Sequence, residues 1–309
     1  MGRGHLSDTE WERLRPFLPV SNRRCGRWRD HRQVIDGILH RVRTGVQWRD
    51  LPERFGPWKT VYERHRLWSA DGTWERLLQQ VQAAADAAGE IDWDVSVDST
   101  IVRAHQHAAG AHNDPAGSRL KGGRSPRTPG RNAVAKSARP PGGGGAGGEG
   151  LGRSRGGFTT KLHLSADGRC RPLSLIVTPG QRADCTQFNS VLERIRVPKL
   201  GPGRPRKKPD SVAADKAYSN GPCRESLRRR GIRHTIPEKT DSRAARLRKG
   251  SRGGRPPGFD EERYKKRNTV ERAINRLKQH RAVATRYAKR RYVYLGTATA
   301  AALAIWLRT

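Results

Sequence analysis

Three strand patterns follow one another from residue 91, and they restrict the chain to folds that contain a sheet. The segments "IDWDVSVDSTIV", "GGFTTKLHLSAD" and "RPLSLIVTPG" are rich in β-branched residues and bounded by turn formers. Helical and strand patterns then alternate through "DCTQFNSVLERI", "SVAADKAYS", a helix near 220–230, "RHTIP" and a basic helix over 263–280. This order predicts an α/β fold of the ribonuclease-H-like type, a mixed sheet flanked by helices.

Charge narrows the class of partner. The 309 residues include 63 Lys and Arg against 29 Asp and Glu, a formal charge of +34. Ion pairing within the chain cannot balance such an excess, so we expect a polyanionic partner, nucleic acid first. Biased codon use would explain Arg in place of Lys, but it would not explain the shortage of acids.

The first 78 residues follow a helical pattern and hold six of the eight tryptophans. Ser7 and Glu10 form a capping-box pattern, and "GPWKTVYERHRLWSADGTWERLLQQ" predicts a helix, a turn and a second helix. We expect a small all-helical domain over residues 1–88 that resembles a helix-turn-helix and binds DNA, and the α/β domain over 89–309. The alternative is a helical bundle that only packs on the rest. A third helical pattern, in "HRQVIDGILHRVRTG", places three apolar residues on one face: Val34, Ile38 and Val42.

Three segments lack the composition of folded structure. Residues 108–152 are rich in Gly, Pro, Ala and Arg, and residues 199–210 and 239–258 are similarly polar. We expect all three to be loops, with disorder near 108–152.

The chain shows no sign of membrane insertion or export. The apolar run at 295–307 is too short to cross about 30 Å of hydrocarbon, so it predicts a buried helix. The cysteines have no zinc-like spacing and suggest reduced thiols, and no signal peptide is evident. We expect no membrane partner and a cytoplasmic, nucleoid-associated location.

Two aspartates stand where a charge is costly. Asp98 lies within the strand pattern "VSVDSTIV", and Asp215 lies toward the end of "VAADKAYS". A carboxylate among strand hydrophobes needs a partner or a metal ion. Together with Glu271 they could form one site that requires Mg²⁺ or Mn²⁺, two of which, about 3.5–4 Å apart, could clamp a phosphodiester. Each Asp taken singly could instead cap a strand or pair with one of the many Arg residues.

Glu271 is surrounded by cations at helical spacing. On a helix over 263–280 an apolar stripe of Val270, Ile274 and Leu277 would face the core. Beside it, four side chains share an arc of about 60°: Tyr264, Arg267, Glu271 and Lys278. The alternative is an ordinary amphipathic helix on which Glu271 pairs with Arg267 or Asn275 in solvent.

These motifs resemble those of DDE transposases from bacterial insertion sequences, in the insertion-sequence-five group. The four residues on the arc match the Tyr-Arg-Glu-Lys signature of that group with the same gaps. "DSTIVRAHQHA" and "ADKAYSN" are similar to the blocks that hold the first and second catalytic Asp. "LPERFGPWKTVYERHRLW" and "LGRSRGGFTTKLHL" resemble further family phrases. The loop at 108–152 is longer and richer in Gly than the family pattern.

The resemblance implies roles for particular residues. Asp98, Asp215 and Glu271 would be the catalytic acids and the ligands of Mg²⁺ or Mn²⁺. Helix geometry adds that Lys278, about two turns beyond Glu271 on the same face, could bind a DNA phosphate, and that Arg267, one turn before it, could neutralise the scissile phosphate or orient Glu271. Tyr264 would contact the DNA backbone or pack.

The implied function is a transposase that binds the terminal inverted repeats of its insertion sequence. It would cleave DNA and join it to target DNA, as a homodimer or higher oligomer on the DNA. One alternative is a catalytically inactive DNA-binding relic or repressor, which the intact acids oppose. Another is a ribonuclease-H-fold nuclease, which the helical N-terminal domain and the four-residue signature oppose.

Overall fold

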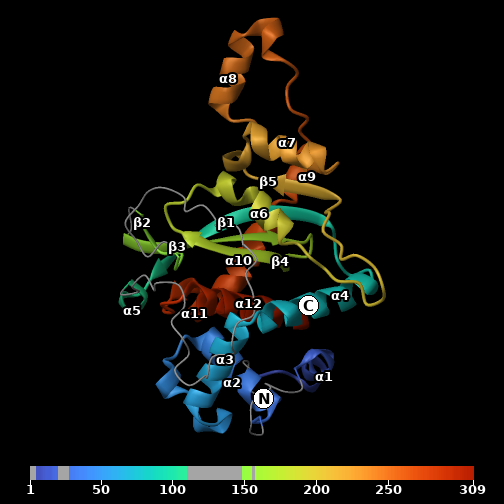
Figure 1. Cartoon of the computed structure of the whole chain (residues 1–309). Coiled ribbons are helices and arrows are strands. Elements are labelled where there is room, and N and C mark those ends of the chain that lie inside the picture. Colours follow the sequence, from blue (N-terminus) through green and yellow to red (C-terminus); the bar gives the residue numbers. More distant parts are fainter. Residues whose placement is uncertain (1–4, 20–27, 110–147, 155–156) are drawn as a thin grey trace, which may run out of the picture.

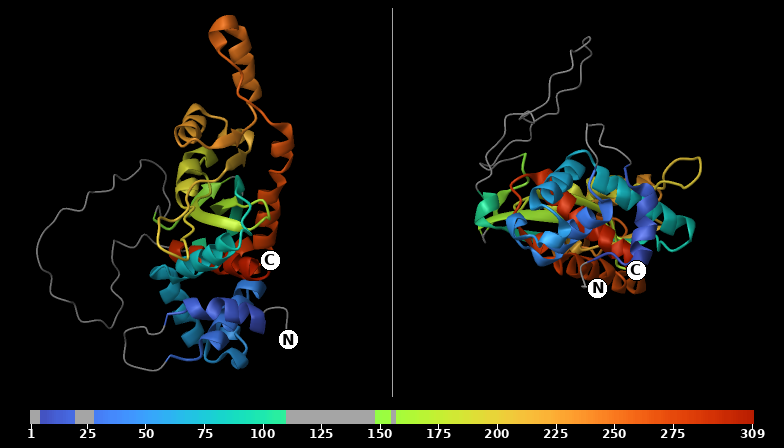
Figure 2. Two further views of the ribbon diagram at one scale, coloured as in Figure 1. Left: turned by 90° about the vertical axis from the view of Figure 1, so that its right-hand side faces the viewer. Right: turned by 90° about the horizontal axis from the view of Figure 1, so that it is seen from below.

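The computed structural model describes residues 5–19, 28–109, 148–154 and 157–309. The N-terminal helices form one end of the molecule, the sheet lies in the middle and a narrow arm projects from the opposite end (Figure 1). The left view in Figure 2 shows the same division along the long axis. Most of the loop predicted at 108–152, namely residues 110–147, lies outside the described residues.

One mixed sheet of seven strands forms the centre of the described structure. Strand β1 (Asp94–Ala104) pairs antiparallel with β3 (Gly157–Ala166) and parallel with β5 (Ser211–Ala214). Beyond β3 lies β4 (Pro172–Pro179), antiparallel to it, and beyond β5 lies β6 (Arg233–Thr235), parallel to it. The order β4-β3-β1-β5-β6, with three antiparallel strands and then two parallel to β1, confirms the predicted ribonuclease-H-like fold.

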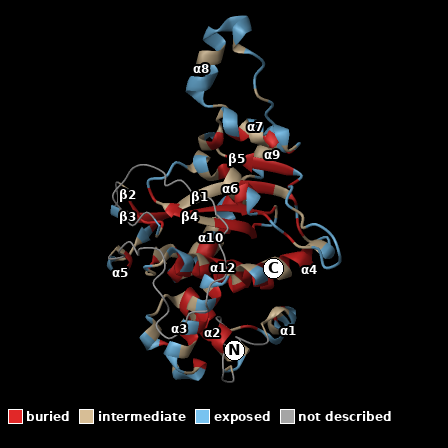
Figure 3. Ribbon diagram, in the orientation of Figure 1, coloured by how far each residue is buried: buried red, intermediate tan, exposed pale blue. Residues whose placement is uncertain are grey.

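Two short strands complete the sheet. Strand β2 (Gly152–Ser154) pairs antiparallel with the start of β3, and β7 (Thr285–Arg286) pairs with the last residues of β1. The segment 159–166 of β3 is buried without a break, because helices cover this part of the sheet (Figure 3). In a strand that is covered on both faces, each side chain is either apolar or a polar group with a hydrogen-bond partner, and apolar and polar residues do not alternate.

The N-terminal helices form where the sequence predicts them. These are α1 (Asp8–Leu14), α2 (His31–Thr44), α3 (Trp58–Ala70) and α4 (Thr73–Ala87). The capping box at Ser7 is present, with both reciprocal hydrogen bonds. Gly72, at φ 76°, occupies the left-handed conformation between α3 and α4, which glycine adopts without a steric penalty. The predicted apolar face of α2 is fully buried: Val34, Ile38 and Val42.

Helix α12 (Arg291–Leu307) joins the two parts of the molecule. It packs on α3 and α4 from the N-terminal part and on β4 from the sheet. The indole Nε1 of Trp306 donates a hydrogen bond to the Pro172 carbonyl at 2.6 Å. The prediction of a buried helix at 295–307 is confirmed, and within the described residues no helix is long and apolar enough to cross a membrane.

The remaining helices surround the sheet. Helix α6 (Phe188–Glu193) packs on β3 and β4, and α10 (Asn268–Lys278) packs on β1 and β3. The others are short and connect strands or helices: α5 (Gln106–Ala109), α7 (Gly221–Arg229), α8 (Thr240–Arg248), α9 (Glu261–Lys265) and α11 (Arg281–Ala284).

Two predicted elements are wrong. The continuous helix over 263–280 is broken: α9 ends at Lys265, and α10 begins at Asn268 after a turn closed by hydrogen bonds of the i to i+3 type. The segment 239–258, predicted as a loop, contains α8 and a 3-10 turn at Gly250–Gly253, which form the projecting arm. A bidentate pair between Arg246 and Glu238, at 3.1 and 3.0 Å, fastens α8 to the preceding segment.

Candidate active site

Strand pairing brings Asp98 and Asp215 to neighbouring positions. Val97 of β1 pairs with Ala214, the last residue of β5, so the next residue of each strand is one of the two aspartates. Asp98 lies in the middle of β1, where strand geometry fixes its direction. Asp215 caps the 3-10 turn Lys216–Tyr218, and its Oδ1 accepts a hydrogen bond from the Lys216 N–H at 2.6 Å. The chain therefore turns away from the sheet at Asp215.

Helix α10 adds the third acid, Glu271. The helix buries Val270, Ala273 and Leu277 against the sheet, as the apolar stripe predicted for two of them. The Thr269 hydroxyl donates to the Ser96 hydroxyl at 3.2 Å and fastens the start of α10 to β1. Glu271 lies beside this contact with 47% of its side chain exposed.

Arg267 links two of the three acids. Its Nη2 lies 2.6 Å from Glu271 Oε1, and its Nη1 lies 3.6 Å from Asp98 Oδ2. Only 17% of the Arg267 side chain is exposed, and its guanidinium lies over the Tyr264 ring at 5.6 Å. The pairing of Glu271 with Arg267, considered above as an ordinary solvent contact, is present, and the Glu271 carboxylate is exposed while Arg267 is largely buried.

The protonation of Asp98 shows how the charges of this site act on one another. Burial raises the pKa of Asp98, and the charges of Asp215 and Glu271 raise it further. The Ser99 N–H, which donates at 2.8 Å, and the Arg267 guanidinium lower it, but the net pKa is above the ordinary value. Two acids close enough to raise the pKa of a third create a local demand for positive charge.

The donor set suits a hard divalent cation. All three acids offer carboxylate oxygens, which Mg²⁺ and Mn²⁺ prefer over nitrogen and sulfur ligands. In the part of the chain that the structure describes, no three acidic, imidazole or thiol side chains are close enough together to hold one metal ion. The chemistry of the residues fits a metal, and Arg267 supplies part of the compensating charge in the arrangement described.

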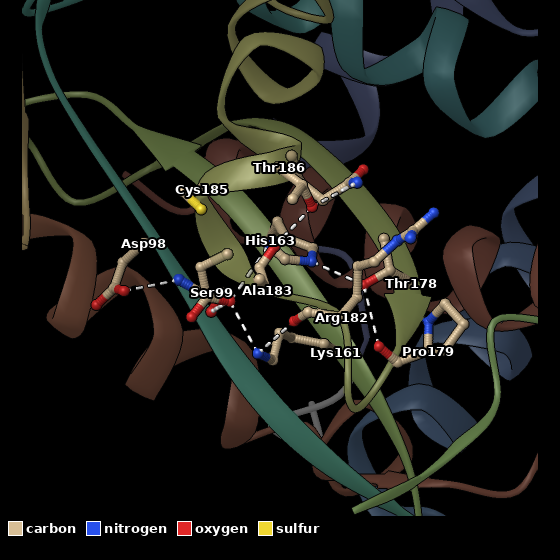
Figure 4. A network of polar contacts seen from close by, with 12 residues as sticks. Asp98, Ser99, Lys161, His163, Thr178, Pro179, Arg182, Ala183, Cys185 and Thr186 are labelled. Carbon is tan, nitrogen blue, oxygen red and sulfur yellow. Dashed lines mark hydrogen bonds and ion pairs between the residues drawn. The ribbon is translucent and has the colours of Figure 1, made fainter. Parts of the chain in front are cut away.

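A second polar network lies behind Asp98, and sequence reasoning missed it. The Ser99 hydroxyl donates to Asp184 Oδ1 at 2.6 Å, and Lys161 Nζ lies 2.9 Å from the same oxygen (Figure 4). Burial raises the pKa of Asp184, but the hydrogen bonds from Ser99 and Lys161 outweigh it and leave the pKa below its usual value. Lys161 also donates to the Arg182 carbonyl at 2.8 Å. The signal was available, because a lysine inside the strand pattern "TTKLHL" raises the same question as Asp98.

Two buried side chains complete this network. His163 Nε2 lies 2.8 Å from Thr178 Oγ1, and burial lowers the pKa of His163 to about 4, so the ring is neutral near pH 7. Burial also disfavours the charged form of Tyr218 and so raises its pKa, and the charges of Asp98 and Asp184 raise that pKa further. The region behind Asp98 is therefore largely buried, and Asp184 and Lys161 form an ion pair within it.

The residues predicted to bind DNA lie around the acids. Lys278 Nζ lies 3.4 Å from the Ile101 carbonyl, near the exposed part of β1 beyond Asp98. Tyr264 is on α9 rather than on the helix of Glu271, but it stays near the site through Arg267 and through its contact with the Phe259 ring at 5.2 Å. All four residues of the predicted arc therefore remain on one side of the sheet.

Comparison with known proteins decides which family has this arrangement. The family model described as "Transposase DDE domain" matches residues 91–307, which contain all three acids. The chain belongs to the DDE transposase family. A second model, described as "Putative transposase of IS4/5 family", matches residues 6–78. A DDE transposase is an enzyme that cleaves and transfers DNA strands, and this family uses divalent metal ions.

Curated relatives agree with this assignment. The transposase is 30% identical over 151 residues to "Putative transposase for insertion sequence element IS6501" of Brucella ovis, covering 49% of this chain and all of that protein. It is 42% identical over 123 residues to "Uncharacterized protein y4sN" of Sinorhizobium fredii, covering 40% of this chain and 90% of that protein. It is 36% identical over 112 residues to "Insertion element IS402 uncharacterized 16.2 kDa protein" of Burkholderia cepacia, covering 34% and 76%. No solved structure matches the chain.

Proposed function

We propose that this transposase binds the terminal inverted repeats of its own insertion sequence and cuts and joins DNA with Asp98, Asp215 and Glu271 as its catalytic acids. The observation that supports this most is the convergence of β1, β5 and α10. Strand register places the first two acids at adjacent positions, and the charge of Glu271 acts on Asp98. Isolated salt bridges would not require two strands and a helix to bring three acids within electrostatic reach of one another in a chain so rich in cations.

Mg²⁺ is the ion that we propose for the three acids, with Mn²⁺ as a substitute. When bound, such an ion activates water and stabilises the charge of a phosphodiester under attack. Arg267 would orient Glu271 through their 2.6 Å contact and face the phosphate side of the site. Lys278 would pair with a DNA phosphate, and Tyr264 would hold Arg267 in place. Ser99 and its partner Asp184 would hold the Asp98 carboxylate in direction.

The N-terminal helices are the proposed reader of the terminal repeats, and the active form on DNA is proposed to be a homodimer or higher oligomer. The charge of +34 supports strong phosphate binding. Because α12 packs on α3 and α4, sequence preference is best measured with the whole chain. Full-length protein should bind a terminal-repeat duplex more tightly than a scrambled duplex. Equal affinity for both would limit these helices to a packing role.

The central test replaces each acid by its amide. Asp98→Asn, Asp215→Asn and Glu271→Gln keep shape but remove the charge that holds a divalent cation, so each should abolish Mg²⁺-dependent nicking of a terminal-repeat duplex and leave duplex binding intact. Glu225→Gln, at an exposed acid on α7, is the matched control and should cut normally. A folded Glu271→Gln protein that cuts at nearly the wild-type rate would refute the mechanism. A wild-type protein that binds the repeats without cutting would indicate the inactive relic instead.

A further inference from the structure

A second cleft lies between the N-terminal helices and the far end of β1. It has a volume of about 910 Å³. One set of its lining residues comes from the segment around Trp48 and from α3, and another follows β1 and β7. His105, which lines the cleft, lies seven residues after Asp98 along and just beyond β1. Seven residues of extended chain span roughly 23 Å, so the cleft is separate from the three acids. None of the roles proposed above uses it.

Aromatic rings line this cleft. Trp48 and Tyr62 lie with their ring centres 5.4 Å apart, and His105 and Tyr287 lie 4.9 Å apart. Trp58, the first residue of α3, keeps 37% of its surface exposed, which is unusual for so large an apolar side chain. Rings that face an open space provide surfaces on which other flat groups can stack.

The charge of the cleft is positive, and one of its cations has no counter-ion. Arg41 is only 7% exposed, lines the cleft, and stacks its guanidinium over the Trp48 ring at 5.0 Å. Among the described residues its Nε has no hydrogen-bond partner and its side chain has no ion pair. Burial lowers the pKa of Arg41 to about 10. A buried guanidinium of this kind is destabilising unless an anion pairs with it.

Other lining residues support the same chemistry. Arg49 lies over the Trp58 ring at 5.9 Å, and Lys289 contributes a further cation. Asp50 is the single acid among the residues that line the cleft in the described structure. Cations with exposed aromatic rings are the combination by which proteins hold single-stranded nucleic acid, since phosphates bind the cations and unpaired bases stack on the rings.

We propose that this cleft binds unpaired nucleotides of the DNA on which the transposase acts, with bases stacked on Trp58 and Tyr287 and a backbone phosphate paired with Arg41. Duplex DNA does not fit this description, because its base faces are already covered by neighbouring bases. The proposal rests on the proposed function only in taking DNA as the partner. It adds a single-strand site at a distance from the acids.

The test compares two probes on the full-length protein: a labelled single-stranded oligonucleotide and a blunt duplex of equal length. Trp58→Ala and Arg49→Gln alter exposed residues and should leave the fold intact. Stacking of one base is worth about 1–3 kcal/mol, so Trp58→Ala should weaken single-strand binding by roughly 5- to 150-fold. Arg49→Gln should weaken it less, and neither variant should change the affinity for a duplex that lacks the terminal-repeat sequence.

Arg54→Gln is the matched control. Arg54, like Arg49, is exposed in a short 3-10 turn and covers an aromatic ring, Phe55 at 4.7 Å, but it lies outside the cleft. It should leave both affinities unchanged. Arg41→Lys, with circular dichroism to check folding, should weaken single-strand binding if the buried guanidinium meets a phosphate.

Three outcomes would overturn the proposal. Unchanged single-strand affinity in Trp58→Ala would remove the stacking site. An equal loss of single-strand and duplex binding would assign the cleft to duplex backbone. Equal effects of Arg49→Gln and Arg54→Gln would leave only general charge attraction. A failure of the proposed function differs from all of these, because it would appear as absent duplex binding or absent nicking.

Discussion

The Nη2 atom of Arg267 lies 2.6 Å from the Oε1 atom of Glu271, one helical turn further along the chain. The other terminal nitrogen of the same guanidinium faces Asp98. Burial raises the pKa of Asp98, whereas the charge of Arg267 lowers it. Arg267 is therefore the cation that counters the mutual repulsion of the acids. Its loss should change the protonation of Asp98 as well as contacts to DNA.

Replacing Arg267 with Gln should shift the acid limb of the cleavage profile to higher pH. Without the guanidinium, the pKa of Asp98 rises further, so the carboxylate forms only at higher pH. The measurement is the rate of Mg²⁺-dependent nicking against pH. Arg272→Gln, which removes an exposed cation next to Glu271, should lower the rate little and leave the profile in place. An unshifted profile in Arg267→Gln would show that Arg267 does not act on Asp98.

Ser99 and Asp184 should act as one unit. Ser99→Ala and Asp184→Asn each weaken the 2.6 Å hydrogen bond behind Asp98, and losing support of this kind typically costs about 10- to 100-fold in activity. The double variant should lose less than the sum of the two single variants, because both changes act on the same hydrogen bond, while Asp184→Asn alone also removes the charge that pairs with Lys161. Thr186→Ala removes a hydroxyl that bonds only to nearby residues, the Ala183 carbonyl and the Gln187 amide, and serves as the control. Additive losses would separate the two roles.

The buried pair of Arg171 and Asp167 should be important for stability. Arg171 Nε and Nη2 donate to Asp167 Oδ2 at 2.8 and 2.6 Å, and both side chains are almost fully buried. Arg171→Met leaves an uncompensated buried charge and should lower the free energy of unfolding by about 3–5 kcal/mol, measured by urea denaturation.

The chain offers a matched control for this pair. Arg229 and Glu225 have the same i to i+4 spacing but lie in solvent, so Arg229→Met should cost about 0–1 kcal/mol. Replacing both buried partners, with Arg171→Met and Asp167→Leu together, should recover much of the loss. A similar cost for the buried and the exposed variants would contradict the assignment.

His65 should make the fold sensitive to acid. Its Nδ1 accepts from Trp74 Nε1 at 3.1 Å and its Nε2 lies 3.1 Å from Thr297 Oγ1, so the ring is held neutral. Burial, assisted by the charge of Arg41, lowers the pKa of His65 to about 3. The unfolded chain takes up a proton near the ordinary value of 6.5, whereas the folded chain does not, so stability should fall as pH drops from about 6.5 toward 3.

Urea unfolding at several pH values measures this slope. His65→Gln should be less stable at pH 7 and should lose less stability on acidification. His107→Gln, at an exposed position, should retain the wild-type slope. A slope unchanged by His65→Gln would assign the acid sensitivity to other groups.

Much of the architecture could be predicted because local patterns and burial agree. β1, β3 and β4 follow their strand patterns, and the capping box of α1 and the turn at Gly72 are set by short-range chemistry. Asp98 could be singled out because a charge inside a strand demands an explanation.

Other features depend on contacts that no local pattern contains. The network of Asp184 and Lys161 forms only when β3 aligns with β1. The break before α10 was hidden by continuous helical spacing. The arm that contains α8 depends on the ion pair between Glu238 and Arg246. The composition of residues 239–258 by itself predicts only a charged loop. The unpaired state of Arg41 is likewise visible only after folding, because many acids in the sequence could have met it.

The position of α12 has a consequence for synthesis on the ribosome. The neutral ring of His65 depends on Thr297, which lies 232 residues later in the chain. The N-terminal helices therefore leave the ribosome long before α12, on which they pack, is synthesised. Their apolar surfaces stay exposed until then. Because chains begin to fold from the N-terminus during translation, this delay exposes the nascent protein to aggregation. A chain interrupted before residue 291 would lack α12 altogether, so α3 and α4 would be left without the helix on which both of them pack.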